Sequence, residues 1–264
     1  MPFEPAGISH AITEVVFGLA FERPFAPEEI VAVLNAQDKF KDRLPGVNRM
    51  SSFPIFIQGH QIGDQNAGIA FDRYNSAGGL EQRLRIEGNA IHVNSLTYSR
   101  WDEVSRDALA LISECMSIAI QSKNHVKGVL LQYVDLFQWN GDIEEYSLSE
   151  LFNKKSSFYP GSIFGKGPFW HLHQGWFRTK SLPTKGKMLE RLTTDGVLNE
   201  QGQPLVKIDC YLGLDIDTGA ASNDLSLKRG DEISVIDLFD YLHEQNKIIV
   251  KSCLTDEMNN RIGL

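Results

Sequence analysis

The C-terminal segment, residues 234–264, is the feature that most constrains the fold of this chain. Apolar side chains recur in it every three or four residues, with charged side chains between them. This is the period of a long amphipathic helix that buries one face on a sheet. Ser234 is a suitable N-cap, and Thr255 can cap a short second helix that ends near Ile262. The apolar stripe consists of Val235, Leu238, Phe239, Leu242, Ile249, Val250, Cys253 and Leu254.

Length and composition are those of an ordinary globular protein. The chain has 264 residues, of which 42% are hydrophobic and 23% charged, so it can bury the core of one large domain or of two intimate halves. Its first residues lack a basic region followed by an apolar run, and no window approaches the roughly 18 apolar residues of a membrane span. The 3 cysteines lie far apart in apolar patterns, which is typical of buried thiols in a reducing compartment. We therefore expect a cytoplasmic protein that does not contact a membrane.

The predicted elements form two successive sets with the same order. The first set has an apolar strand at 12–21, a helix at 27–44, strands at 53–58, 68–74 and 80–98, and a helix capped by Ser99. The sequence Glu87-Gly88-Asn89 is a turn signal that can split the last strand into a hairpin. The second set has a strand at 126–139, a short helix at 147–152, strands at 169–178, 188–194 and 204–217, and the C-terminal helix.

The repeated order predicts an α+β fold built by tandem duplication. Each half consists of a strand, a helix, three or four antiparallel strands and a second helix. We assign the halves to residues 1–124 and 125–264 and expect them to pack as one continuous unit. The expected product is one curved antiparallel sheet backed by the long helices, as in TATA-binding-protein-like or helix-grip-like arrangements. The first strand of each half is apolar on both faces, which favours a central position in the sheet.

Three stretches carry a resemblance to a known family. They are Ile12-Thr13-Glu14-Val15-Val16, the segment LLQYVDL at 130–136, and NKIIVKSCLTD at 246–256. In them the chain resembles a sporadically distributed family of uncharacterised bacterial proteins with the motifs I-x-E-V-V, L-x-Y-x-N-R-I and K-N-x-I-F-x-x-S-L-T-D. The chain departs from the family at Asp135-Leu136, where the family has Asn-Arg, and it inverts the Lys-Asn order. The resemblance implies no established activity, and the patchy distribution of the family implies defence-associated or mobile genes.

The strand predicted at 204–217 presents a row of candidate polar residues. Its even-numbered residues from 208 to 216 are apolar, while Asp209, Tyr211, Asp215 and Asp217 share the other face. Asp215 and Asp217 would lie about 7 Å apart, and two carboxylates can begin a Mg²⁺ or Ca²⁺ site. The commoner interpretation of such a row is the solvated face of a half-buried strand.

Two histidines and a group of lysines are further candidates. His171 and His173 share one strand face and can offer two imidazoles to Zn²⁺, although packed or hydrogen-bonded histidines are commoner and no third ligand is near in sequence. Lys180, Lys185 and Lys187 lie in the densest basic stretch, which can contact a nucleotide or nucleic acid or simply form a solvated loop. The net charge of −8 disfavours general nucleic-acid binding, because phosphate affinity needs clustered basic residues.

Two functional hypotheses remain open. No phosphate-binding loop, nucleophile elbow, H-E-x-x-H or C-x-x-C motif occurs in the sequence. We favour a non-enzymatic binding or regulatory protein of a bacterial, defence- or mobile-element-associated system, which holds a protein partner through its sheet face or edge loops without a cofactor. The alternative is a metal-dependent hydrolase or nuclease that uses an Asp/His cluster on the sheet.

Overall fold

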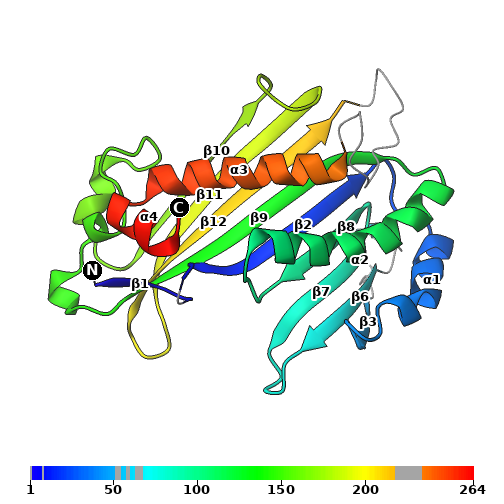
Figure 1. Ribbon diagram of the computed structural model, residues 1–264, viewed down its shortest axis with the longest axis horizontal. Helices are drawn as coiled ribbons and strands as arrows, with labels where there is room; N and C mark the ends of the chain where they lie inside the picture. The colour runs from blue at the N-terminus through cyan, green and yellow to red at the C-terminus, as the bar shows by residue number, and fades with distance from the viewer. Residues whose placement is uncertain (1, 8, 51–54, 58–59, 63–67, 218–233) are drawn as a thin grey trace.

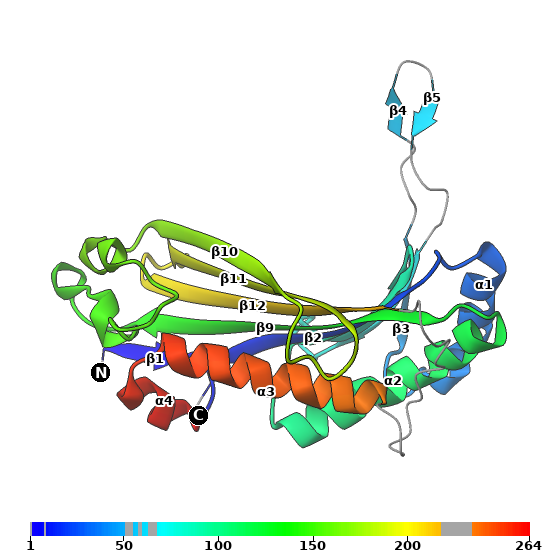
Figure 2. The same ribbon diagram turned by 90° about the horizontal axis from the view of Figure 1, so that it is seen from above.

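A computed structural model gives the structure of residues 2–7, 9–50, 55–57, 60–62, 68–217 and 234–264. The fold is α+β, with one antiparallel sheet of 10 strands and the long helices α2 and α3 along one of its faces (Figures 1 and 2). The predicted class, one large antiparallel sheet backed by long helices, is therefore confirmed. No helix of the described residues is both long and apolar enough to span a bilayer.

The main sheet runs in the order β10-β11-β12-β9-β2-β8-β7-β6-β3, and β1 pairs with β9. Its strands are β1 (Phe3–Pro5), β2 (Ile12–Phe21), β3 (Gly46–Met50), β6 (Gly68–Tyr74), β7 (Leu80–Glu87), β8 (Ala90–Ser95), β9 (Val126–Trp139), β10 (Trp170–Arg178), β11 (Gly186–Leu198) and β12 (Pro204–Ile216). A separate hairpin consists of β4 (Ile55–Ile57) and β5 (His60–Ile62). The helices are α1 (Pro27–Asn35), α2 (Trp101–Gln121), α3 (Val235–Cys253) and α4 (Asp256–Ile262), with 3₁₀ turns η1 (Gln37–Lys39), η2 (Ile143–Glu145), η3 (Leu148–Glu150) and η4 (Gly161–Gly165).

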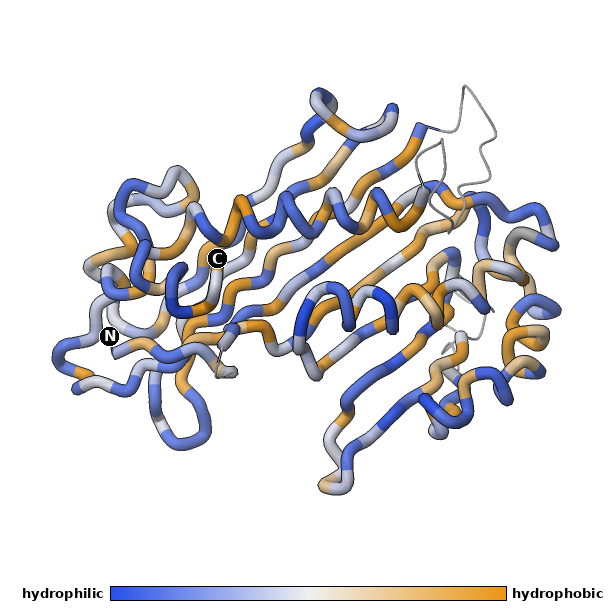
Figure 3. Tube along the Cα trace, viewed as in Figure 1, coloured by the Kyte–Doolittle hydropathy of each residue, from blue (hydrophilic) through white to orange (hydrophobic). Residues whose placement is uncertain are grey.

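The strands β2 and β9 occupy the middle of the sheet and pair with each other. This confirms the central position expected from their apolar sequences. Side chains alternate along β9, so that Leu131, Tyr133 and Phe137 are buried towards the helices while Leu130 and Gln132 are half-buried on the other face. Figure 3 shows hydrophobic residues recurring along these central strands and along both long helices.

The two long helices share one core. Phe239 of α3 and Trp101 of α2 both contact Phe17 of β2, with ring centroids 5.4 and 5.5 Å apart. Ser234 caps α3 as predicted, because its hydroxyl accepts the Asp237 N–H and the Asp237 carboxylate accepts the Ser234 N–H. Aromatic packing near the centre of the sheet therefore holds both helices against it.

In several places the secondary structure is shorter or less regular than the sequence predicts. The helix expected at 27–44 begins at Pro27 but ends at Asn35. Phe40 and Leu44 are buried through a 3₁₀ turn and the following loop. The short helix expected at 147–152 is the single 3₁₀ turn η3. The strand expected at 53–58 is described only at Ile55–Ile57, and its other residues lie outside the described part of the chain. The hairpin turn at residues 88–89 is present between β7 and β8.

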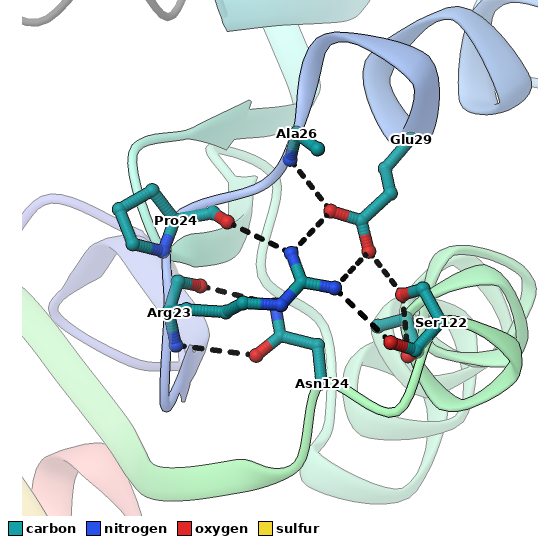
Figure 4. Close-up of polar contacts among 7 residues, drawn as sticks. Arg23, Pro24, Ala26, Glu29, Ser122 and Asn124 are labelled. Atoms are coloured by element: carbon teal, nitrogen blue, oxygen red, sulfur yellow. Dashed lines mark hydrogen bonds and ion pairs between the residues drawn. The ribbon is translucent and has the colours of Figure 1, made fainter.

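A hydrogen-bonded cluster fastens α1 to the junction that follows α2 (Figure 4). The Arg23 guanidinium donates to Glu29 at 2.8 and 3.1 Å and to the Ser122 carbonyl at 3.1 Å. The Ser122 hydroxyl also donates to Glu29, and Asn124 exchanges bonds with the backbone of Arg23. Burial acts to raise the pKa of Glu29, but these donors and the Ala26 N–H outweigh it, so the pKa is lowered. The Glu29 carboxylate therefore stays ionised, and the cluster holds Ser122 and Asn124 in place just before β9 begins.

Candidate functional site on the open face of the sheet

The sheet face opposite α2 and α3, called the open face below, carries most of the predicted site residues (Figure 2). On β12 the even-numbered residues Ile208 to Leu214 are buried against the helices, so the odd-numbered residues point the other way. These include Asp209, Tyr211 and Asp215. The register of β10, β11 and β12 places His171, His173 and Lys187 on the same face.

Polar side chains of strands β9 to β12 on this face pair with neighbours on adjacent strands. His171 bonds to Asp195 through Nδ1, and His173 Nδ1 lies 2.7 Å from the Thr193 hydroxyl. The Gln132 amide donates to both oxygens of Asp209 at 2.8 and 3.0 Å. These side chains are thus held by cross-strand bonds, as on the solvated face of a half-buried sheet.

Two cations lie on aromatic rings on strands β10 to β12 of the open face. The Arg191 guanidinium sits 4.4 Å from the ring centroid of Tyr211, and Lys187 Nζ sits 4.6 Å from that of Phe177. Burial and the neighbouring Asp215 raise the pKa of Tyr211 against the opposing effect of Arg191. The rings present apolar surface while the cations keep charge at the rim, which is a common arrangement at binding surfaces.

A hollow of about 400 Å³ lies beside these rings and extends over β2, β8, β9 and β12. Its floor contains Gly18, Gly128 and Gly213 from three neighbouring strands. A Cβ atom on Gly18 would lie 2.7 Å from Leu130 Cδ2, and one on Gly213 would lie 2.8 Å from the Tyr211 ring. A side chain at Gly18 or Gly213 would therefore displace Leu130 or Tyr211, and the absence of these side chains leaves the hollow open. Glycine within a strand is the sequence signal that could have located it.

His92 lines one side of the hollow as a neutral imidazole. Its Nδ1 atom is buried without a hydrogen-bond partner among the described residues. Burial, assisted by the positive charge of Arg85, lowers the pKa of His92 to about 4. Near neutral pH this ring therefore adds an uncharged donor or acceptor to the wall.

The lateral part of the open face, over β3, β6 and β7, is filled by a bonded network. Asp72 is fully buried and accepts bonds from Arg83 at 2.6 and 2.9 Å and from the Tyr74 hydroxyl at 3.0 Å. Asn48 donates to the same carboxylate. Burial acts to raise the pKa of Asp72, but the bonds from Arg83, Tyr74 and Asn48 prevail and lower it. This lateral region of the open face is therefore occupied by its own ion pair.

The remaining predicted residues lie at the rim near the β10–β11 hairpin. Lys180 and Lys185 are exposed in the connection between these strands. Asp217 follows β12 directly, and its backbone N–H donates to the Lys185 carbonyl at 3.0 Å. Of the three predicted lysines only Lys187 lines the hollow, while the connection that carries Lys180 contacts α3 through the Ser181 carbonyl, which accepts the Tyr241 hydroxyl at 3.1 Å.

The structure does not gather the acids and histidines of the metal hypothesis. The strand β11 lies between the histidines of β10 and the acids of β12. Asp209 and Asp215 are six positions apart on β12, which corresponds to about 20 Å along a strand. Within the described residues no group of three or more His, Cys, Asp or Glu side chains can hold a metal ion. The hydrolase hypothesis gains no supporting geometry from these residues.

Comparison with known proteins gives no match: no family model, no curated protein and no solved structure matches the chain. What the open face can bind therefore has to follow from its own chemistry. Its central part combines a glycine-floored hollow, two exposed or half-exposed rings and charges of both signs. This combination suits an irregular partner that presents an apolar side chain between polar groups.

Proposed function

We propose that this chain is a non-enzymatic binding or regulatory protein that holds a protein partner on the open face of its sheet. The observation that carries the proposal is the hollow beside the exposed ring of Phe177 and the half-buried Tyr211 and Leu189. An aromatic anchor beside a pocket is the usual centre of a protein–protein interface. A partner side chain inserted into the hollow would cover this apolar surface.

The charges around the hollow favour a protein over a nucleic acid. Lys187 and Arg191 are balanced by Asp215 and Asp209 on the neighbouring strand. A polyphosphate backbone would bring its negative charge close to these acids, whereas a protein segment can present both signs. The net charge of −8 points the same way.

The proposal is tested by a pair of matched substitutions. Phe177 is 60% exposed on the open face and Ile248 is 61% exposed on α3. Both residues are exposed to a similar fraction, so changing either one to Asp replaces a largely exposed apolar side chain without removing a fully buried one. We expect Phe177→Asp to remove a co-purifying protein that wild type and Ile248→Asp both retain, as measured by quantitative mass spectrometry of tagged protein. Equal recovery with both variants would argue against the open face as the interface.

We also propose that the two halves arose by duplication. In support, the strands run outward from the centre as β2-β8-β7-β6 on one side and as β9-β12-β11-β10 on the other. In each half the central strand is β2 or β9, and the strand that pairs with it on the outer side, β8 or β12, is the last strand of that half. The remaining strands lie farther out, and a long helix, α2 or α3, follows β8 or β12 along the chain. An experimental structure in which residues 10–120 and 126–255 do not superpose would contradict this origin and the TATA-binding-protein-like or helix-grip-like assignment.

The biological setting is proposed from the family resemblance alone. The motifs at Ile12–Val16 and at 246–256 place the chain beside a family whose patchy distribution favours defence-associated or mobile genes. Genome neighbourhoods test this idea, since defence or transposition genes should recur beside the gene. Neighbours drawn from housekeeping pathways would contradict it.

A further inference from the structure

A second cavity lies on the opposite side of the sheet from the open face, under the helices. Its volume is about 560 Å³. It is bounded by β9, by the start of α2, by the second half of α3 and by the segments at residues 9–12 and 262–264. Trp101 and His243 stack at 4.1 Å with nearly parallel rings and form one of its walls. The cavity is therefore independent of the hollow proposed to hold a protein partner.

A buried carboxylate lines this cavity. Asp135 lies in the alternating sequence of β9 at a position that faces the helices, between the buried Tyr133 and Phe137. Its exposed fraction is only 4%. Among the described residues no hydrogen bond or ion pair reaches the Asp135 carboxylate, and burial is the one cause that shifts its pKa. A buried acid without a partner is costly, and proteins retain one mainly where something else satisfies it.

Two further polar groups that line the cavity lack partners among the described residues. Asn246 of α3 is 6% exposed, and its buried Nδ2 atom has no acceptor within hydrogen-bonding distance, although the amide lies near the Cys210 thiol and acts to lower the pKa of that thiol. His10, which precedes β2, has a buried Nδ1 atom that is also unpaired. An acceptor and an amide donor thus line one cavity from different elements. Their joint lack of partners points to a molecule that enters and supplies both.

The walls around Asp135 are aromatic. Tyr98 lies with its ring 5.2 Å from His10 and 6.3 Å from Tyr133, and Trp101 closes the side nearest α2. A carboxylate among aromatic faces is the chemistry that recognises an ammonium group, through a charge-assisted hydrogen bond and cation–π attraction. The unpaired amide of Asn246 requires an acceptor on the same ligand. Arg100 and Lys247, which also line the cavity, favour a negatively charged acceptor.

We propose that this cavity binds a small amino-acid-like molecule, with its protonated primary amine on Asp135 and an oxygen acceptor on Asn246. The volume is within the range of ordinary small-molecule pockets. The charged and titratable groups that line the cavity are His10, Tyr98, Arg100, Asp102, Tyr133, Asp135, His243 and Lys247. His243 is held by the Tyr133 hydroxyl at 2.8 Å. Burial lowers its pKa to about 4 despite the nearby acids, so near neutral pH the ring is uncharged and does not repel the amine.

The test is calorimetric titration of the full chain with each free L-amino acid and with its N-acetyl derivative. We expect at least one free amino acid to bind wild type, its acetylated form not to bind, and Asp135→Asn to weaken binding more than tenfold, which corresponds to the loss of one charged hydrogen bond. Asp42→Asn, at an exposed residue that lines neither the cavity nor the hollow, is the control and should bind as wild type does. Asn246→Ala should weaken binding independently of the charge at residue 135.

Three results would overturn the proposal. They are the absence of binding by every amino acid in the panel, equal binding of the acetylated partner, and undiminished binding to Asp135→Asn. Thermal melts of the variants in the same buffer show whether each is folded. Because Asn is close in size to Asp and removes a buried charge, Asp135→Asn is expected to fold. The Phe177→Asp experiment tests the partner surface on the open face, and the titration tests the cavity under the helices. A negative result in one experiment therefore does not affect the other proposal.

Discussion

Replacing Asp135 by Asn should change how the stability of this protein depends on pH. Burial raises the pKa of Asp135 to about 7 in the folded chain, whereas an unfolded Asp has a pKa of about 3.9. The folded state therefore holds the proton more tightly than the unfolded state. Its contribution to stability is fully present below about pH 4 and is lost as the pH rises through about 7.

The size of this effect follows from the two pKa values. A separation of about 3 units is worth about 4 kcal/mol when the pH passes both values. Between about pH 5 and about pH 8, where both proteins are easier to handle, the expected loss is about 2–3 kcal/mol. The amide introduced by Asp135→Asn cannot ionise, so the variant shows no such loss. The stability of Asp135→Asn relative to wild type should thus increase by that amount over this pH range.

The assay is a denaturant melt of each protein at the two pH values. Only the change in the difference between variant and wild type matters, so titration of groups common to both proteins, such as the ion pairs of Asp72 and Glu29, cancels to first order. Buffers must be free of primary amines, because an amine bound at Asp135 would stabilise the ionised form. Asp135→Ser serves as a second neutral variant. A difference that stays constant between the two pH values would refute the claim that Asp135 is buried without a partner.

Two further predictions concern stability. Phe239 is fully buried against Phe17, so Phe239→Ala should lower the free energy of unfolding by about 3–5 kcal/mol. The control Glu244→Ala, at an exposed residue, should change it by no more than about 0.5 kcal/mol. Equal denaturant midpoints for the two variants would show that α3 is not a core element. Arg23→Ala leaves the buried Glu29 without its cation and should cost about 1–3 kcal/mol, with Arg23→Lys intermediate; a thermal melt unchanged by either substitution would contradict the role of the cluster in Figure 4.

The sequence predicted the central strands and long helices because their signals are local. The limits of β9 agree with the apolar run at 126–139, and alternation along β12 correctly separated Asp209 and Tyr211 from the core. The strand β1 was missed because three residues carry no period, and its pairing with β9 comes from tertiary contact. Asp240 lies off the apolar stripe of α3, yet it is not simply solvated, since its carboxylate accepts the Trp101 indole N–H at 2.9 Å.

The site was harder to predict because it depends on lateral register. Sequence spacing places His171 and His173 on one face, yet it cannot show that Asp195 and Thr193 lie opposite them. The same limit hid the cavity under the helices. Asp135 occupies a helix-facing position of an otherwise apolar alternation, which is a visible anomaly, but its unpaired neighbours come from segments more than a hundred residues away. Only the assembled fold brings these groups to one place.

The position of β9 between β2 and β12 has a consequence for how this protein is made. A ribosome delivers β2 and its neighbours β8, β7 and β6 before any residue of β9 has emerged. During that interval one long side of β2 has open backbone amides and carbonyls, and such an edge invites pairing with another chain. The nascent chain can aggregate through this edge until β9 has been synthesised and has paired with β2. Slow translation or a pause before Val126 would therefore lengthen the time during which the edge is unpaired. Chaperone demand should therefore peak midway through synthesis.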